Sequence, residues 1–173
     1  AEKENLIKEQ IKNYHEVKND YKFINVTSGN RNEKVVKDLS PFFIGPVKSE
    51  DGIVFDCFES YWQYSKVYKC HIDDKNLPTD SWFKWRLAGS KVKGKASRYP
   101  KGMCGRDCVY SYYYINGKYE KLDYVTSRKR IYIPEYAKLI VNTDTFKELK
   151  QYYENGGKII IGDFDAWNYY GRE

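Results

Sequence analysis

The sequence predicts a single mixed α+β domain that is rich in helix and carries a small sheet and a tyrosine-rich β-hairpin. Its length of 173 residues lies within the roughly 100–200 residues of one domain. Segments with apolar residues at helical spacing are interspersed with short apolar or alternating runs, which are typical of strands. The dipeptide Asn116-Gly117 separates two such runs, and it favours a type I′ turn because both positions tolerate a positive φ. We therefore expect residues 1–173 to form one domain.

Four segments are expected at the start of the chain. Residues 2–18 place apolar side chains at helical spacing among charges, which predicts an amphipathic N-terminal helix. Residues 21–26 alternate and precede a Ser-Gly-Asn turn, which predicts a strand, and a short helix is expected over residues 31–38. Residues 39–46 hold two prolines and a glycine, so they predict an apolar, irregular loop.

The middle of the chain predicts a short strand at residues 53–55 and a helix over residues 58–69, which contain no Gly or Pro. Another helix is expected to start near residues 78–80, where Thr or Asp can cap it. Residues 88–108 combine several glycines with an excess of basic side chains, which predicts a long loop.

The last third begins with the hairpin over residues 109–122. Helical signals return after Thr126, with a break or kink at Pro134, and again after the Thr-Asp pair at residues 143–144. Residues 158–163 form a continuous apolar run that ends in an aspartate, which predicts a short buried strand.

Aromatic residues are abundant, with 18 Tyr, 8 Phe and 4 Trp making 17% of the chain. Such rings build a core with polar tips, and they also stack on planar ligands. An AT-rich genome, bacterial or phage, would enrich the codons of Lys, Asn, Ile and Tyr. Core packing and composition bias are therefore the alternative to a functional role for the aromatic residues.

The net charge of +6 allows a weak attraction to phosphates. Basic residues gather at 91–101 and 128–130, where a solvated surface is the alternative to a binding groove. No run approaches the ~20 apolar residues of a membrane span, and the amino terminus is too charged for a secretory leader. We therefore expect a cytoplasmic protein, in the host cytoplasm if viral, with no membrane contact. The sequence leaves its oligomeric state open.

The four cysteines are Cys57, Cys70, Cys104 and Cys108. In a cytosolic protein of this size we expect free, reduced thiols. Cys104 and Cys108 are four apart and Cys70 precedes His71, so a zinc site is the alternative. No pair has the C-x-x-C spacing that structural zinc sites favour, so we expect no metal. We also expect no cofactor.

The most informative segment is the predicted helix that starts at residue 58. Glu59, Gln63 and Lys66 stand at i, i+4 and i+7, so a carboxylate, an amide and an ammonium would share one helical face. Aromatic side chains flank them, and a carboxylate in such surroundings suits a proton donor or base. The alternative is an exposed polar face with Tyr61 and Trp62 buried behind it.

Two further constellations carry polar and aromatic groups together. Asp163 and Asp165 leave the predicted last strand and precede Trp167 and Tyr169, which is where α/β folds tend to place ligands. A capping turn with a packed aromatic tail is the alternative there.

If its segment is helical, Arg128 lies one turn from both Tyr124 and Tyr132 and offers a guanidinium and rings to a phosphate or a base. The alternative is an ordinary basic helix start at the surface.

Other common chemistries lack their motifs. The chain has no G-x-x-x-x-G-K-[ST] loop, no dinucleotide glycine fingerprint between a strand and a helix, and no G-x-S-x-G elbow. Its two histidines lie in segments without clear structure, so the chain offers no good candidate for the histidine of a Ser or Cys catalytic triad.

Taken together, these segments resemble the NADAR family. Its members share an aromatic Ser-Pro-Phe segment, a Ser-x-Glu-x-x-x-Gln-x-x-Lys helix and a closing Asp-x-x-Trp-Gly type segment. The counterparts here are residues 40–43 with Phe43, then Glu59, Gln63 and Lys66, then Asp165 with residues 167–171. Cys57 stands where the family usually has the serine before the glutamate, and the closing segment is longer than the family's.

The resemblance implies an N-glycosidase that acts on riboflavin-pathway intermediates or on ADP-ribose attached to guanine bases. It implies Glu59 as acid, base or water activator, Gln63 and Lys66 as orienting groups, and Asp163 or Asp165 as the stabiliser of positive charge. Rings at Trp62, Trp167 and Tyr169 would stack on a base, and Arg128 would receive a diphosphate. We thus expect a hydrolase of an ADP-ribosyl or nucleotide-derived substrate, with nucleic acid as a further partner. A non-catalytic nucleotide or nucleic-acid binding protein is the alternative.

Overall fold

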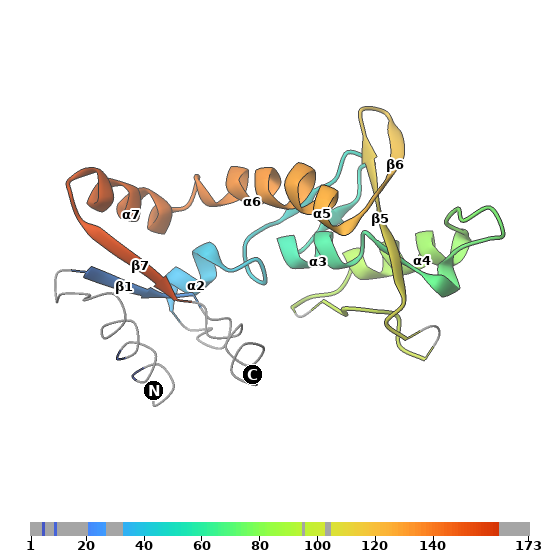
Figure 1. Ribbon diagram of the computed structural model, residues 1–173, viewed down its shortest axis with the longest axis horizontal. Coiled ribbons are helices and arrows are strands. Elements are labelled where there is room, and N and C mark those ends of the chain that lie inside the picture. The colour runs from blue at the N-terminus through green and yellow to red at the C-terminus, as the bar shows by residue number, and fades with distance from the viewer. Residues whose placement is uncertain are drawn as a thin grey trace. The chain divides into compact units, whose positions relative to one another are not determined.

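The computed structural model describes residues 5, 9, 21–26, 33–94, 96–102 and 105–162. It divides into two units: unit 1 holds the chain up to Ser40 and again from Asn142, and unit 2 is Pro41–Val141. Both units mix helices and strands, so the predicted α+β class, with its small sheets and tyrosine-rich hairpin, is confirmed (Figure 1). Most of the predicted helix over residues 2–18 lies outside the described residues.

The strands of unit 1 come from opposite ends of the sequence. β1 (Tyr21–Asn25) and β7 (Lys158–Gly162) pair in parallel, with Tyr21 opposite Lys158. Both strands were expected, but the expectation that the second is buried is wrong, since Ile161 is 63% exposed. A strand is buried on both faces when layers cover both sides of its sheet, and this sheet has two strands in the described part of the chain.

The helices of unit 1 are α2 (Lys34–Leu39) and α7 (Asp144–Glu154). They are tied together by the Thr145 hydroxyl, which donates to Asp38 Oδ2 at 2.6 Å. The Thr143 hydroxyl accepts the backbone N–H three residues later at 3.2 Å, which confirms the predicted cap of α7.

Unit 2 contains two antiparallel sheets. β2 (Val47–Lys48) pairs with β3 (Val54–Phe55), and a three-stranded sheet has the order β4 (Lys66–Tyr68), β5 (Cys108–Ile115), β6 (Lys118–Leu122). Figure 1 shows β5 and β6 side by side, joined by the predicted hairpin turn.

That turn has the expected backbone. Asn116 and Gly117 have φ values of 52° and 82°, as a type I′ turn requires. Across the hairpin the Tyr112 and Tyr119 rings stack with centroids 4.8 Å apart, which is the kind of cross-strand pair that fixes a strand register.

The helix predicted over residues 58–69 is shorter than expected. α3 is Phe58–Gln63, and the chain then turns into β4. At the turn the Ser65 hydroxyl donates to Tyr61 O at 2.7 Å and accepts from Arg86 Nη1 at 2.8 Å. Pairing of β4 with β5 follows, so Lys66 is a strand residue and not part of a helical face.

The next elements are a short 3₁₀ turn, η1 (Lys69–His71), and α4 (Asp80–Ser90). The start predicted for this second helix is confirmed. Thr79 stands at its N-cap without a side-chain capping bond, and its hydroxyl donates instead to His71 O at 3.1 Å.

Of the break or kink predicted at Pro134, the break is absent, because the chain is helical from residue 124 to residue 140. It runs through α5 (Tyr124–Ser127), a π-helical turn η2 (Arg128–Tyr132) and α6 (Ile133–Ile140). Pro134 lies at the start of α6. Because the chain is already helical before it, the missing N–H of Pro134 removes one bond from the helical ladder, next to the π-helical turn η2.

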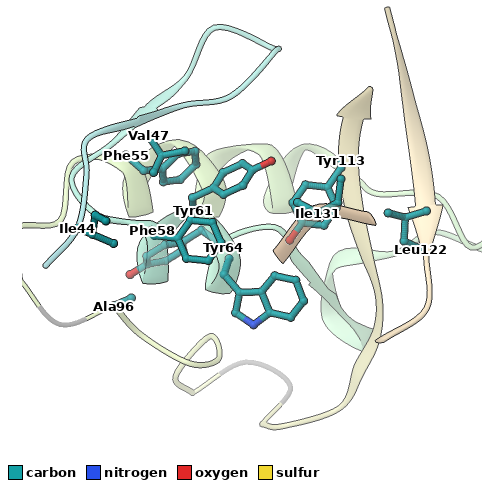
Figure 2. Close-up of a cluster of buried hydrophobic side chains, with 11 residues drawn as sticks. Ile44, Val47, Phe55, Phe58, Tyr61, Tyr64, Ala96, Tyr113, Leu122 and Ile131 are labelled. Atoms are coloured by element: carbon teal, nitrogen blue, oxygen red, sulfur yellow. The ribbon is translucent and has the colours of Figure 1, made fainter. Parts of the chain in front are cut away.

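The core of unit 2 is built largely from rings (Figure 2). Tyr61 lies edge-on to Tyr113 at 5.6 Å, and Phe58 lies edge-on to Tyr132 at 4.8 Å. Trp62 is 4% exposed and belongs to the same cluster. A good part of the aromatic excess is therefore core packing. The buried members of the cluster are Ile44, Val47, Phe55, Phe58, Tyr61, Trp62, Tyr64, Ala96, Tyr113, Leu122 and Ile131.

A buried ion pair crosses this core. Arg86 Nη2 lies 3.1 Å from Asp51 Oδ2, and the two side chains are 1% and 8% exposed. The Tyr119 hydroxyl donates to the same oxygen at 2.9 Å. Although burial raises the pKa of Asp51, the Arg86 guanidinium and hydrogen bonds from Ser49 and Tyr119 outweigh it and lower the pKa below its usual value. The pair ties the residue 49–53 turn to α4 and β6.

No helix in the described ranges has the length and apolarity that a bilayer crossing demands.

Candidate functional site

Three polar side chains of unit 2 form one hydrogen-bonded chain. Gln63 Nε2 donates to Glu59 Oε1 at 2.7 Å, and Lys66 Nζ donates to Gln63 Oε1 at 2.8 Å. The spacing predicted this grouping, and it survives the early end of α3 because Lys66 reaches back from the first position of β4. Glu59 and Gln63 are only 7% and 6% exposed, so the alternative of a solvated polar face is wrong.

The segment before α3 fixes the position of Glu59. The backbone N–H of Glu59 donates to Pro41 O at 2.7 Å, and the backbone N–H of Phe58 donates to Ile44 O at 2.8 Å. These carbonyls satisfy N–H groups that the first turn of a helix leaves unpaired. Phe43 lies in the same segment and is 36% exposed. The Ser-Pro-Phe segment and the glutamate are therefore neighbours in space.

Cations cover the Trp62 ring. Lys66 Nζ lies 5.8 Å from its centroid and Arg128 Cζ lies 5.9 Å from it, while Arg128 stacks on Tyr132 at 4.0 Å. The predicted pairing of Arg128 with Tyr132 is present, on the π-helical turn η2. Trp62 itself is buried and covered by these groups, so its ring has no free face for a base to stack on.

Tyr124 is 65% exposed and meets the Trp62 ring edge-on at 6.3 Å. It therefore offers an accessible aromatic surface at the start of α5, beside the cations that cover Trp62.

A cavity of about 730 Å³ opens beside Lys66. Its wall is formed by β4, by the start of β5, and by residues in the described ranges 96–101 and 105–106. Among the described residues that line it, four side chains are cationic and none is acidic. The lining residues are Lys66, Tyr68, Ala96, Ser97, Arg98, Tyr99, Lys101, Arg106 and Cys108. Lys66 thus belongs both to the polar chain and to the cavity wall, whereas Glu59 and Gln63 are not lining residues of this cavity.

The electrostatics of the cavity follow from its burial and charge. Burial lowers the pKa of Lys66, and the guanidinium groups of Arg98 and Arg128 lower it further, against the opposing effects of Cys108 and Glu59. Burial also raises the pKa of the Cys108 thiol, which the Lys66 ammonium only partly offsets. Cys108 is a free thiol, and with a raised pKa it keeps its proton near neutral pH.

The C-terminal constellation predicted from the sequence lies outside the described residues. This concerns Asp163, Asp165, Trp167 and Tyr169, which follow the end of β7 at Gly162. Their predicted roles at the anomeric carbon and as stacking rings remain predictions.

One expectation about the cysteines is corrected. Cys70 is disulfide-bonded, so the four cysteines are not all free thiols. A disulfide depends on which cysteines the fold brings together, and chain spacing does not reveal that. Among the described residues no group of three or more His, Cys, Asp or Glu side chains could hold a metal ion.

His71 does not lie in an unstructured segment. It is fully buried against Trp85 and Tyr68, and its two ring nitrogens have no hydrogen-bond partner in the described part of the chain.

Sequence reasoning missed two features of unit 2. The basic excess at residues 91–101 indicates a cationic surface, but it does not indicate that Arg106 and Cys108 line the same cavity. The Asp51–Arg86 pair joins residues 35 positions apart.

We compared the chain with protein-family models, with curated proteins and with solved structures, and none of the three comparisons gives a match. Inference of function therefore starts from the side chains described above.

Proposed function

We propose that the protein hydrolyses N-glycosidic bonds in an ADP-ribosyl or nucleotide-derived substrate, including ADP-ribose attached to bases of nucleic acid. One observation carries the proposal. The Glu59 carboxylate is buried and accepts a hydrogen bond from Gln63. The chain of hydrogen bonds continues to Lys66, which lines a cationic cavity. A held carboxylate next to a binding site for phosphates is the pairing that such a reaction needs.

The chemistry follows from the bond that breaks. As the C–N bond breaks, its electron pair leaves with the nitrogen and positive charge develops on the anomeric carbon. A water molecule adds to that carbon and gives one proton to the Glu59 carboxylate. The carboxyl group then returns a proton to the departing nitrogen, which regenerates the carboxylate. The net change is the addition of one water across the bond.

Gln63 gives this carboxylate its orientation. Its amide donates to Glu59 and accepts from Lys66, so both ends of the amide are fixed and its orientation cannot reverse without loss of both bonds. A positioned base loses no free energy to reorganisation during the reaction.

The contact between Pro41 and Glu59 further supports the proposal. It joins two of the segments that resemble the NADAR family, and residues 41 and 59 are far enough apart in sequence that their proximity was not implied by the motifs themselves.

The test is Glu59→Gln, which keeps the shape of the side chain and removes its ability to accept a proton as a carboxylate. With ADP-ribosylated guanosine and ADP-ribosylated DNA as substrates, we expect release of the base by the natural protein and at least a hundredfold slower release by the variant. The control is Glu148→Gln on the exposed side of α7. Circular dichroism verifies that both variants fold. Base release by Glu59→Gln at the natural rate contradicts the proposal.

The second candidate function is a non-catalytic nucleotide or nucleic-acid binding protein. It is favoured by the same cavity, whose described lining residues include cations and no carboxylate. ADP-ribose should raise the melting temperature under either proposal, but only a hydrolase releases product. A nucleic-acid binder would lose affinity steeply with rising salt.

A further inference from the structure

Among the described residues, the lining of the cavity carries four cations and no carboxylate. Among the ion pairs found in the described ranges, none includes Lys66, Arg98, Lys101 or Arg106. Like charges that share a partly enclosed space repel one another. Burial is the main cause of the lowered pKa of Lys66, and repulsion from the Arg98 guanidinium adds to it. A bound anion would relieve this repulsion.

The loop that carries these cations is anchored to the core. The N–H of Ser97 donates to the hydroxyl of Tyr64 at 3.2 Å, and the hydroxyl of Tyr68 donates to the carbonyl of Arg98. Tyr64 is 3% exposed and Tyr68 is 2% exposed. The backbone on both sides of the Arg98 side chain is therefore held before any ligand arrives, which lowers the entropy lost on binding.

The second arginine is oriented by a ring. Arg106 Cζ lies 5.1 Å from the centroid of Tyr99, and Arg106 Nη2 donates to the Tyr99 hydroxyl at 3.4 Å. The planar guanidinium thus keeps further N–H groups for a ligand, and planar forks bind phosphate oxygens in pairs.

We propose that this cavity binds a diphosphate, through Arg98 and Arg106 with help from Lys66 and Lys101, so that Arg128 is not the diphosphate group's main partner. The inference deepens the proposed function and rests on it for the identity of the rest of the ligand. The volume of about 730 Å³ lies in the range of small-molecule sites, roughly 300–1,000 Å³. Arg128 does not line the cavity and is stacked on Tyr132.

The bound diphosphate would also place the substrate relative to Glu59. Lys66 Nζ reaches both the cavity and Gln63, so a phosphate oxygen at Lys66 lies two side chains from the carboxylate.

Calorimetric titrations of the full chain with ADP-ribose, ADP, AMP and adenosine test the inference. We expect ADP and ADP-ribose to bind at least tenfold more tightly than AMP, and adenosine not to bind. Arg98→Ala and Arg106→Ala should each weaken ADP binding about tenfold or more, as expected for charge-assisted hydrogen bonds. The matched control, Lys118→Ala, removes an exposed cation from β6 and should leave affinity unchanged.

Several results would overturn the inference. These are equal affinity for ADP and AMP, natural affinity in both arginine variants, or a larger loss from Arg128→Ala than from Arg106→Ala. Tighter binding of a single-stranded oligonucleotide than of ADP, with a steep dependence on salt, would also overturn it and assign the cavity to a nucleic-acid backbone.

The test separates this inference from the proposed function. ADP binding that depends on Arg98 and Arg106, together with hydrolysis that survives Glu59→Gln, would leave the diphosphate site standing and remove the hydrolase mechanism. If Glu59→Gln abolishes hydrolysis and neither arginine substitution changes ADP binding, the hydrolase mechanism stands and the diphosphate site is removed.

Discussion

Replacing Arg86 with methionine should destabilise unit 2 strongly. The substitution removes two hydrogen bonds to Asp51 Oδ2, at 3.1 and 3.2 Å, and one to Ser65 Oγ at 2.8 Å. Methionine fills much of the same volume, so the main cost is the Asp51 carboxylate, which is 8% exposed and loses its counter-ion. Removing one partner of a buried pair costs roughly 3–5 kcal/mol. We therefore expect a loss of about 4 kcal/mol in the free energy of unfolding of unit 2.

Urea unfolding followed by tryptophan fluorescence measures this loss. Trp62, Trp82 and Trp85 belong to unit 2, so most of the signal reports on it. Lys84→Met is the matched control, because it removes an exposed cation from the same helix, and it should change stability by less than about 0.5 kcal/mol.

If Arg86→Met fails to fold, Asp51→Asn offers a milder version of the same change. It keeps the shape of the side chain and removes its charge, so it should also destabilise unit 2, by less than the arginine variant. A loss below about 1 kcal/mol in Arg86→Met, with an unchanged denaturant slope, would refute the reasoning that this pair holds the turn, α4 and β6 together.

Three further changes have defined outcomes. Gly89→Ala places a Cβ 2.2 Å from ring atoms of the buried Tyr64, so calorimetry should show a loss of about 1–3 kcal/mol or more, whereas no measurable loss would show that the ring can move away. Burial lowers the pKa of His71 below 6.5, so the unfolded chain binds the extra proton first as the pH falls. Stability measured by urea unfolding should therefore drop by up to about 1 kcal/mol between pH 7 and pH 5.5, and an equal drop in His71→Leu would assign it to other groups. Gly117→Ala forces a side chain onto a φ of 82° and should lower the thermal midpoint by an amount equivalent to about 1–2 kcal/mol, while an unchanged midpoint would argue against a rigid turn.

Local signals in the sequence predicted much of the fold. The Asn-Gly hairpin turn, the Thr143 cap and the proline-interrupted loop before α3 each depend on the conformations open to one or two residues. Such preferences act over a few residues, so they can be recognised without knowledge of the partners. The extent of α3 could not be predicted in this way, because it ends where Ser65 meets Arg86 and where β4 pairs with β5.

The candidate site was predictable only in part. The Glu59, Gln63 and Lys66 grouping follows from spacing, and it persists because a lysine side chain is long enough to reach Gln63 from a strand. The cavity has no such signature, since its wall combines β4, residues in the described ranges 96–101 and 105–106, and the start of β5. The resemblance to the NADAR family implied Trp62 as a stacking ring, whereas the structure buries that ring and places Lys66 and Arg128 near it.

The rate of base release from ADP-ribosylated guanosine, measured for the natural protein and for Glu59→Gln under identical conditions, tests the central claim most directly. The account predicts release by the natural protein and a loss of at least a hundredfold in a variant that remains folded and still binds ADP. Equal rates for the two proteins, or no release by the natural protein from any ADP-ribosyl substrate, would contradict it.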